Sequence, residues 1–211
     1  MAKIFDISRT LNASIATWPE DVQFKLENTL KIKSGASVNL SSITISLHTG
    51  THVDAPYHYL EYGPAVDQID LLPFWGPAQV VTVQREAGPI QVEDFSHVDL
   101  SLAPRVLVRT NAGELPDRMF PESICYPSLE LVDRFARHGT ILYGVDAPSV
   151  DKLDSKTMEI HKALYFNRIH ILEGITLKDV PDGIYELAAI PLKIEGADGS
   201  PVRAVLRSLE S

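Results

Sequence analysis

The sequence has almost no cysteine, no long apolar run and no excess of positive charge. Cys125 is the only cysteine among 211 residues, so an internal disulfide is impossible. We expect no membrane span, because a bilayer-crossing helix needs about 20 consecutive apolar residues. A formal net charge of −9 argues against nucleic acid and anionic membrane as partners, since both attract basic surfaces. A small molecule remains the expected partner.

The N-terminal segment also lacks a targeting signal. Residues 1–6 are too few and too polar to form a signal peptide. A lone cysteine agrees with a reducing compartment, so we expect a cytoplasmic protein. Hydrophobic residues make up 45% of the chain and charged residues 22%, which is ordinary for a globular protein. We therefore expect a single domain over residues 1–211.

Alternating apolar and β-branched residues predict more strand than helix. The stretches that indicate strands are 4–8, 43–47, 79–83, 105–108, 141–145, 170–173, 185–190 and 202–206. The clearest helix begins after the capping residue Ser128 and stops at Gly139. A second runs from Ser155 or Thr157 to Ala163. The pattern predicts a compact α/β domain with a mixed β-sheet flanked by a few helices.

The densest group of metal-binding residue types follows the predicted strand 43–47. Three histidines and one aspartate fall within eleven residues, in the run His48-Thr49-Gly50-Thr51-His52-Val53-Asp54-Ala55-Pro56-Tyr57-His58. Imidazole and carboxylate together suit zinc, or manganese where oxygen ligands are more numerous. The cluster indicates a metal site, and a polar loop with coincidental histidines is the alternative.

The spacing of these residues constrains the backbone. In a straight strand His48 and His52 would lie about 13 Å apart, too far to share one ion. On a regular helix they would share a face, but Asp54 would point away from it. One common site therefore requires an irregular turn between them. Gly50 permits such a turn, and Pro56 stiffens the exit from it.

The eleven-residue run resembles the signature His-x-Gly-Thr-His-x-Asp-x-Pro-x-His of the cyclase-type metal hydrolases. Trp18-Pro19 and four further stretches are similar to the arylformamidase branch of that family: residues 144–156, 171–174, 187–192 and 200–205. The resemblance extends over nearly the whole chain. It departs at Lys152, where proline is expected, and at Lys162, where a second histidine is expected. The fold that it implies is the cyclase-like, swivelling β/β/α unit.

The resemblance also implies a role for individual residues. The implied ligands of two divalent cations, Zn²⁺ first and Mn²⁺ second, are His48, His52, Asp54, His161 and Glu173. Asp54 and Glu173 would bridge the two ions, because a carboxylate has two oxygens and an imidazole only one metal-binding lone pair. His58 would be the acid/base group, and Trp18 would line the substrate pocket. A homodimer is implied as well.

The implied reaction is hydrolysis of N-formyl-L-kynurenine to L-kynurenine and formate, in tryptophan degradation. The same metal site would also suit a different small or cyclic amide, such as isatin or a cyclic imide. Two other hypotheses are a metal-binding protein without turnover and a metal-free structural domain. His58 argues against a metal-binding protein without turnover, because the implied scheme gives it no role as a metal ligand. Asp146 and Asp151 are either partners of the ligands or solvated.

Overall fold

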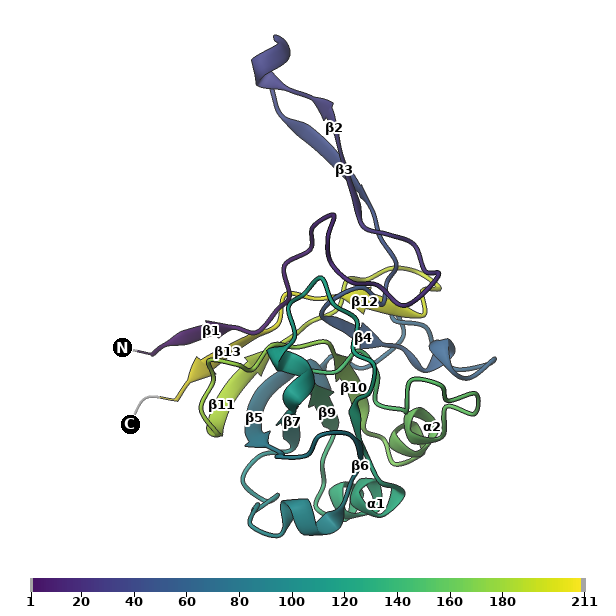
Figure 1. Ribbon diagram of the computed structural model, residues 1–211, viewed down its shortest axis with the longest axis vertical. Coiled ribbons are helices and arrows are strands. Elements are labelled where there is room, and N and C mark those ends of the chain that lie inside the picture. The colour runs from purple at the N-terminus through teal and green to yellow at the C-terminus, as the bar shows by residue number, and fades with distance from the viewer. Residues whose placement is uncertain (1, 210–211) are drawn as a thin grey trace.

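The computed structural model describes residues 2–209, and its main element is one curled, mixed β-sheet (Figure 1). Its strands are β1 (Ile4–Asp6), β4 (His52–Asp54), β5 (Trp75–Thr82), β7 (Arg105–Arg109), β9 (Leu142–Val145), β10 (His170–Glu173), β11 (Gly183–Ala188), β12 (Gly199–Pro201) and β13 (Val205–Ser208). Their order is β1-β13-β11-β5-β7-β9-β10-β4-β12. Neighbours from β5 to β10 pair in parallel, and the outer pairs are antiparallel. The predicted mixed sheet is confirmed.

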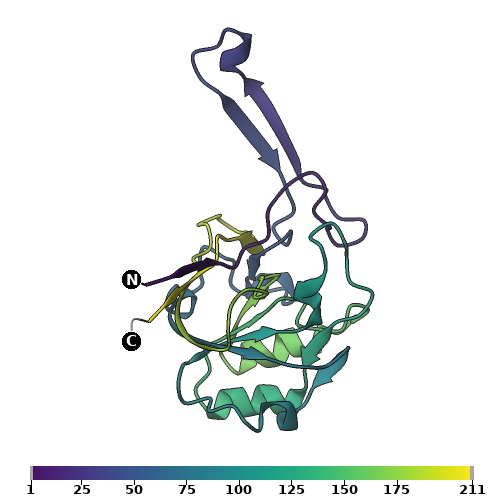
Figure 2. The same cartoon turned by 60° about the vertical axis from the view of Figure 1, so that its left-hand side comes forward.

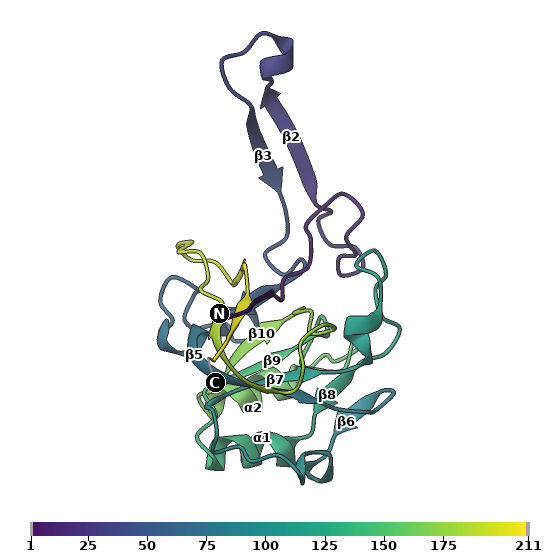
Figure 3. The same ribbon diagram turned by 90° about the vertical axis from the view of Figure 1, so that its left-hand side faces the viewer.

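Two helices lie together beneath the parallel strands, α1 (Leu129–Arg137) and α2 (Glu159–Phe166) (Figure 3). Ser128 caps α1 as predicted, because its side chain accepts a hydrogen bond from the Leu131 amide. The second helix begins later than expected, since Met158 has a φ of +50° and cannot belong to a helix. Among residues 2–209, no helix is long and apolar enough to cross a membrane.

Within residues 2–209, five single turns of 3-10 helix connect the main elements. They are η1 (Ile32–Ser34), η2 (Pro56–His58), η3 (Leu72–Phe74), η4 (Val92–Phe95) and η5 (Asn111–Glu114). Strands β6 (Gly88–Ile90) and β8 (Cys125–Pro127) form a separate parallel pair. Apolar side chains fill two large core clusters and one small one, and one of the large clusters contains residues of both α1 and α2. The central strands are buried along their length, which holds the residues at their ends in place.

A long hairpin leaves the body of the molecule. Its strands are β2 (Lys25–Leu30) and β3 (Leu40–Thr44), and it projects away from the end where the helices lie (Figures 1 and 2). Every residue of both strands is exposed. The strand predicted at 43–47 is confirmed only in part, because β3 begins at Leu40, ends at Thr44 and is exposed along its whole length. We call residues 25–44 the arm.

Candidate metal centre

Two glycines bring the histidine-rich turn against the end of β10. Gly50 and Gly174 have φ values of +73° and +64°, which favour glycine. A Cβ placed on Gly174 would lie 2.1 Å from the Gly50 carbonyl oxygen, so a larger residue would clash. Strand β4 then pairs with β10 so that His52 lies opposite Glu173. The irregular turn expected at Gly50 is confirmed, and the residues that follow it, His52–Asp54, form strand β4.

The three predicted histidine ligands converge on the two predicted carboxylate ligands, Asp54 and Glu173. His52 Nε2 lies 3.4 Å from Asp54 Oδ1 and 3.3 Å from Glu173 Oε2. His161 Nε2, from α2, lies 3.2 Å from Asp54 Oδ2 and 3.5 Å from Glu173 Oε1. His48 Nδ1 lies 2.9 Å from Asp54 Oδ1. Residues more than a hundred positions apart in sequence thus form one cluster.

Each of these histidines has its second nitrogen held from outside the cluster. For His52 the outer partner is the Gly50 carbonyl, 3.0 Å from Nδ1. For His161 it is Asp151, whose Oδ2 lies 2.7 Å from Nδ1. An outer hydrogen bond of this kind fixes the tautomer and leaves the inner nitrogen as a lone-pair donor. Asp151 is therefore a partner of His161, which resolves one of the alternatives left open by the sequence.

For His48 the outer partner is Asp198, just before β12. Its Oδ2 lies 3.0 Å from His48 Nε2 and 3.6 Å from His58 Nδ1. Sequence reasoning missed Asp198, because an aspartate near Gly199 has the composition of an ordinary turn. Asp146, in contrast, is buried away from these histidines. Its carboxylate accepts hydrogen bonds from the Thr110 backbone amide over 2.7 Å and from the Thr110 hydroxyl over 2.6 Å.

The charges of the cluster fit a bound cation. Burial lowers the pKa of His52, but the nearby carboxylates of Asp54 and Glu173 outweigh burial and raise it to about 10. Burial raises the pKa of Asp54, yet its histidine partners hold it well below its usual range. Even so, His52 Nε2 and Asp54 Oδ2 are buried without a hydrogen-bond partner. A divalent ion would satisfy both atoms, so the donor set fits a metal such as zinc or manganese.

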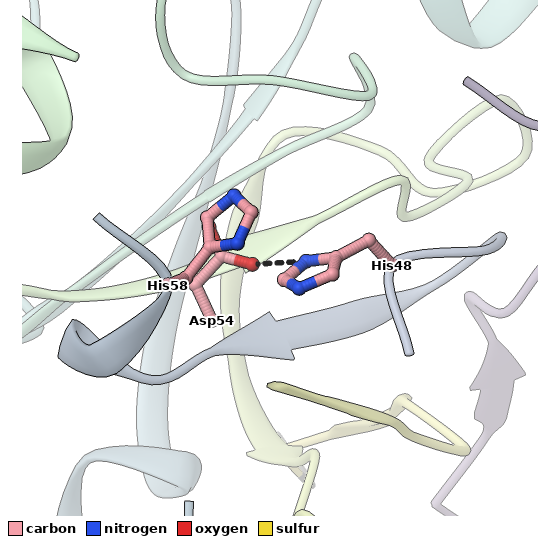
Figure 4. Close-up of side chains that lie close together, drawn as sticks. All are labelled: His48, Asp54 and His58. Carbon is pink, nitrogen blue, oxygen red and sulfur yellow. Dashed lines mark hydrogen bonds and ion pairs between the residues drawn. The ribbon is translucent and has the colours of Figure 1, made fainter. Parts of the chain in front are cut away.

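His58 lies beside this cluster at the end of η2 (Figure 4). Its ring centroid is 4.0 Å from that of His48. Its side chain is 31% exposed, whereas that of His52 is 1% exposed. Burial lowers the pKa of His58, so its imidazole is neutral at neutral pH. Donor atoms of His48, Asp54 and His58 also lie close enough together to share an ion. A neutral, accessible imidazole here is suited to accept a proton.

The cluster forms the floor of a cavity of about 460 Å³. His58 and Glu173 line it, and Trp18 and Phe120 are also part of its lining. The two aromatic rings meet edge-on, with centroids 5.2 Å apart. Trp18 thus lies in the wall of the cavity, where a flat ligand can contact its ring. Cys125 is elsewhere and buried, which raises the pKa of its thiol to about 11 and leaves it unreactive.

Histidine nitrogens and carboxylate oxygens at the floor of a cavity define the site of a metal-dependent hydrolase. The family model Cyclase matches residues 5–152, which is more than half of the chain. The chain belongs to this family. The matched segment contains the cluster from His48 to His58, while His161 and Glu173 lie beyond it.

Relatives extend this likeness to the whole chain. Over 205 residues the protein is 43% identical to the kynurenine formamidase of Salinibacter ruber, with 97% of both chains covered. The solved structure of a potential metal-dependent hydrolase with cyclase activity is 27% identical, covers 100% of both chains and superposes with a TM-score of 0.85. Isatin hydrolase A from Labrenzia aggregata superposes with a TM-score of 0.82 at 22% identity, over 99% of this chain and 94% of that one. The last likeness is one of fold alone.

Proposed function

We propose that this protein hydrolyses N-formyl-L-kynurenine to L-kynurenine and formate, as a step of tryptophan degradation. The observation that carries the proposal is 43% identity to a kynurenine formamidase over 97% of both chains. The cluster beneath the cavity supplies residue types suited to hydrolysis of an amide. Isatin is the weaker alternative, because isatin hydrolase A shares the fold at only 22% identity.

The proposed metal ligands are His48, His52, Asp54, His161 and Glu173, holding two divalent cations, Zn²⁺ first and Mn²⁺ second. The directions of the carboxylate oxygens support two ions. Asp54 Oδ1 faces His48 and His52, whereas Oδ2 faces His161. Glu173 divides its oxygens in the same way, with Oε2 toward His52 and Oε1 toward His161. When bound, the cations would polarise the formyl carbonyl and lower the pKa of water to about 7.

His58 would move the proton in this reaction. Its neutral imidazole can accept a proton from water as the oxygen attacks the formyl carbon. The imidazolium then returns the proton to the anilide nitrogen, because an amide anion is too basic to leave unprotonated. The C–N bond breaks, formate keeps the oxygen from water, and the arylamine departs. Trp18 would offer its ring to the aryl group of the substrate.

We also propose that two chains pair through the arm. A lone two-stranded hairpin is at best marginally stable in water. This arm nevertheless carries exposed apolar side chains, at Leu26, Leu30, Leu40 and Ile43. Cover by a second copy would remove that surface from water, which supports the homodimer. A reducing cytoplasm remains the proposed location, in keeping with the single thiol of Cys125.

The test of the proposed function is formation of L-kynurenine from N-formyl-L-kynurenine, followed by absorbance. We expect turnover that a strong chelator abolishes and that added Zn²⁺ or Mn²⁺ restores. Isatin serves as the parallel substrate, and we expect the formamide to be preferred by at least tenfold in kcat/KM. Preference for isatin would support the alternative, and turnover unaffected by the chelator would show that the reaction does not need the metal.

A further inference from the structure

A second set of charged side chains lines the wall of the same cavity. Arg9 Nη1 donates to Asp117 Oδ1 over 2.9 Å, and both residues line the cavity. The Arg9 side chain is 14% exposed and that of Asp117 is 38% exposed. Their charges are thus neither fully solvated nor sealed in the core. Neither residue contacts the cluster of the metal centre.

The Arg9 side chain is held firmly in place relative to the metal centre. Its backbone amide donates to Thr51 Oγ1 over 2.9 Å, and that hydroxyl donates to the Gly174 carbonyl over 2.7 Å. The same hydroxyl therefore connects Arg9 to the residues that follow Gly50 and Glu173. Arg9 Nη2 donates to the Asp146 carbonyl over 3.0 Å. Because a guanidinium has five N–H donors, further donors remain for a ligand.

The backbone of Asp117 is held by the segment that precedes Trp18. Its backbone carbonyl accepts a hydrogen bond of 2.7 Å from the Ala16 amide, two residues before Trp18. The carboxylate therefore lies close to the segment that supplies the aromatic wall. A carboxylate accepts several hydrogen bonds, so Asp117 can bind Arg9 and an ammonium group together.

The charges around the cavity wall are balanced. Arg9 and Lys152 are positive, and Asp21 and Asp117 are negative. A cavity for a simple anion would be expected to present cations without acidic neighbours, and one for a neutral cyclic amide needs no charges. A ligand with an ammonium and a carboxylate on one carbon matches both members of the Arg9–Asp117 pair.

We propose that Arg9 and Asp117 form a subsite for the zwitterionic end of an α-amino acid. Arg9 binds its carboxylate through the guanidinium, and Asp117 binds its ammonium group. The aryl ring then lies toward Trp18 and the formamide toward the cluster. This subsite rests on the proposed function, and it separates an amino-acid formamide from isatin, which has no such end.

The test compares two aryl formamides that differ only in the amino-acid end. N-formyl-L-kynurenine carries it, and 2′-formamidoacetophenone lacks it. For Asp117→Asn we expect KM for N-formyl-L-kynurenine to rise about tenfold, the loss of one modest charged contact. We expect kcat to stay within about twofold, and the kinetics with 2′-formamidoacetophenone to stay unchanged. Asp182→Asn is the control, because that carboxylate pairs with Arg109 at 3.2 Å outside the cavity.

A second variant distinguishes the two partners. For Arg9→Gln we expect a similar rise in KM with N-formyl-L-kynurenine. N-formylkynurenamine lacks only the carboxylate. With this substrate Arg9→Gln should no longer raise KM, whereas Asp117→Asn should still raise it. An equal loss with all substrates would show that the pair is structural and overturn the subsite. If Arg9→Gln does not fold, the substrate dependence of Asp117→Asn alone decides.

Calorimetric binding of L-kynurenine and 2-aminoacetophenone separates the subsite from the reaction. We expect Asp117→Asn to weaken binding of L-kynurenine about tenfold and that of 2-aminoacetophenone not at all. If Asp117→Asn weakens binding in this selective way but the wild type hydrolyses neither formamide, the proposed function fails and the subsite stands. If the variant binds L-kynurenine as the wild type does, the subsite fails whether or not the protein is a formamidase.

Discussion

The metal centre and the arm both depart from the usual distribution of side chains, with charged groups outside and apolar groups inside. In the centre, charged residues such as His52, Asp54 and Glu173 are at most 3% exposed. In the arm, Leu26 and Ile43 are 54% and 57% exposed. Burial of charge and exposure of apolar surface both cost free energy in an isolated chain. We therefore propose a partner for each region, a cation for the metal centre and a second chain for the arm.

The two regions differ in how tightly the structure prepares them for that partner. The centre is surrounded by outer hydrogen bonds from Gly50, Asp151 and Asp198 that fix each imidazole. The hydrogen bonds of the arm join arm residues to one another, through the ladder between β2 and β3 and through side chains such as Ser41, which donates to Asn28. We therefore expect single substitutions in the centre to have sharp effects on chemistry, and substitutions in the arm to affect assembly. Four predictions test this contrast.

The largest effect is expected for His58→Ala. Loss of a general acid/base group lowers kcat by about 10²–10⁴-fold. The metal content should stay at the wild-type value, because the proposed ligands are intact. The measurements are steady-state hydrolysis of N-formyl-L-kynurenine and elemental analysis, with the exposed His97→Ala as control. Loss of bound metal in His58→Ala would make this residue a ligand instead.

In the arm we expect a large effect on assembly and little on chemistry. Leu26 and Ile43 lie opposite each other in the hairpin, and replacing both with threonine, a residue that favours strands, removes apolar surface. Burial of each apolar side chain is worth about 1.5–3 kcal/mol, so the dimer dissociation constant should rise at least about a hundredfold. Analytical ultracentrifugation measures it, with Ser42→Thr as control. An unchanged constant, or a monomeric wild type, would refute the role of the arm.

Smaller effects are expected for the carboxylates behind the ligands. Asp151→Asn should weaken metal binding about 10–100-fold, because His161 loses the partner that orients it. Asp198→Asn should weaken it less, since the Asp198 side chain is 41% exposed and water can replace it. Competition with a chromogenic chelator gives both affinities. Affinities equal to that of the wild type would mean that these carboxylates do not support the ligands.

The smallest effect concerns pH and the metal-free protein. Burial lowers the pKa of His48, but hydrogen bonds to Asp198 and Asp54 raise it to about 9, and similar partners raise that of His161 to about 10. A histidine whose pKa is higher in the folded than in the unfolded protein stabilises the fold when it is protonated. This stabilisation is complete below the unfolded pKa of about 6.5 and is lost as the pH rises through the folded pKa. The Tm of metal-free protein should fall by several degrees between pH 6.5 and 9.5.

Bound metal should abolish this dependence on pH. A cation replaces the protons on the same nitrogens, so the Tm of the metal-loaded protein should change less over that range. Differential scanning calorimetry of both forms in matched buffers makes the comparison. A metal-free Tm that is level or rises between pH 6.5 and 9.5 would contradict the charge assignment in the centre.

Much of the sheet could be predicted from the sequence. Buried strands such as β9 and β10 are short apolar runs, and Ser128 and Gly139 mark the ends of α1. The arm was not predicted as such, because the alternation near Ile43 is typical of a half-buried strand, and sequence does not reveal whether a body lies beneath it. Strand β12 was missed as well, since Gly199–Pro201 has the composition of a turn.

The candidate site divides in the same way. Residue density and the required turn at Gly50 indicated the cluster from His48, and resemblance placed His161 and Glu173 with it. The outer partner Asp198 could not be predicted, because its contact with His48 spans 150 positions and follows only from the pairing of β12 with β4. The Arg9–Asp117 pair has the same cause, since it joins residues 108 positions apart.

The central claim is that the buried carboxylates and histidines hold catalytic cations. Its most direct test is the metal content of protein purified without added metal, measured by elemental analysis beside its rate of N-formyl-L-kynurenine hydrolysis. We predict about two equivalents of divalent metal per chain, and a rate that falls and recovers with that content as metal is removed and restored. Full hydrolysis by protein that contains no metal would contradict the account.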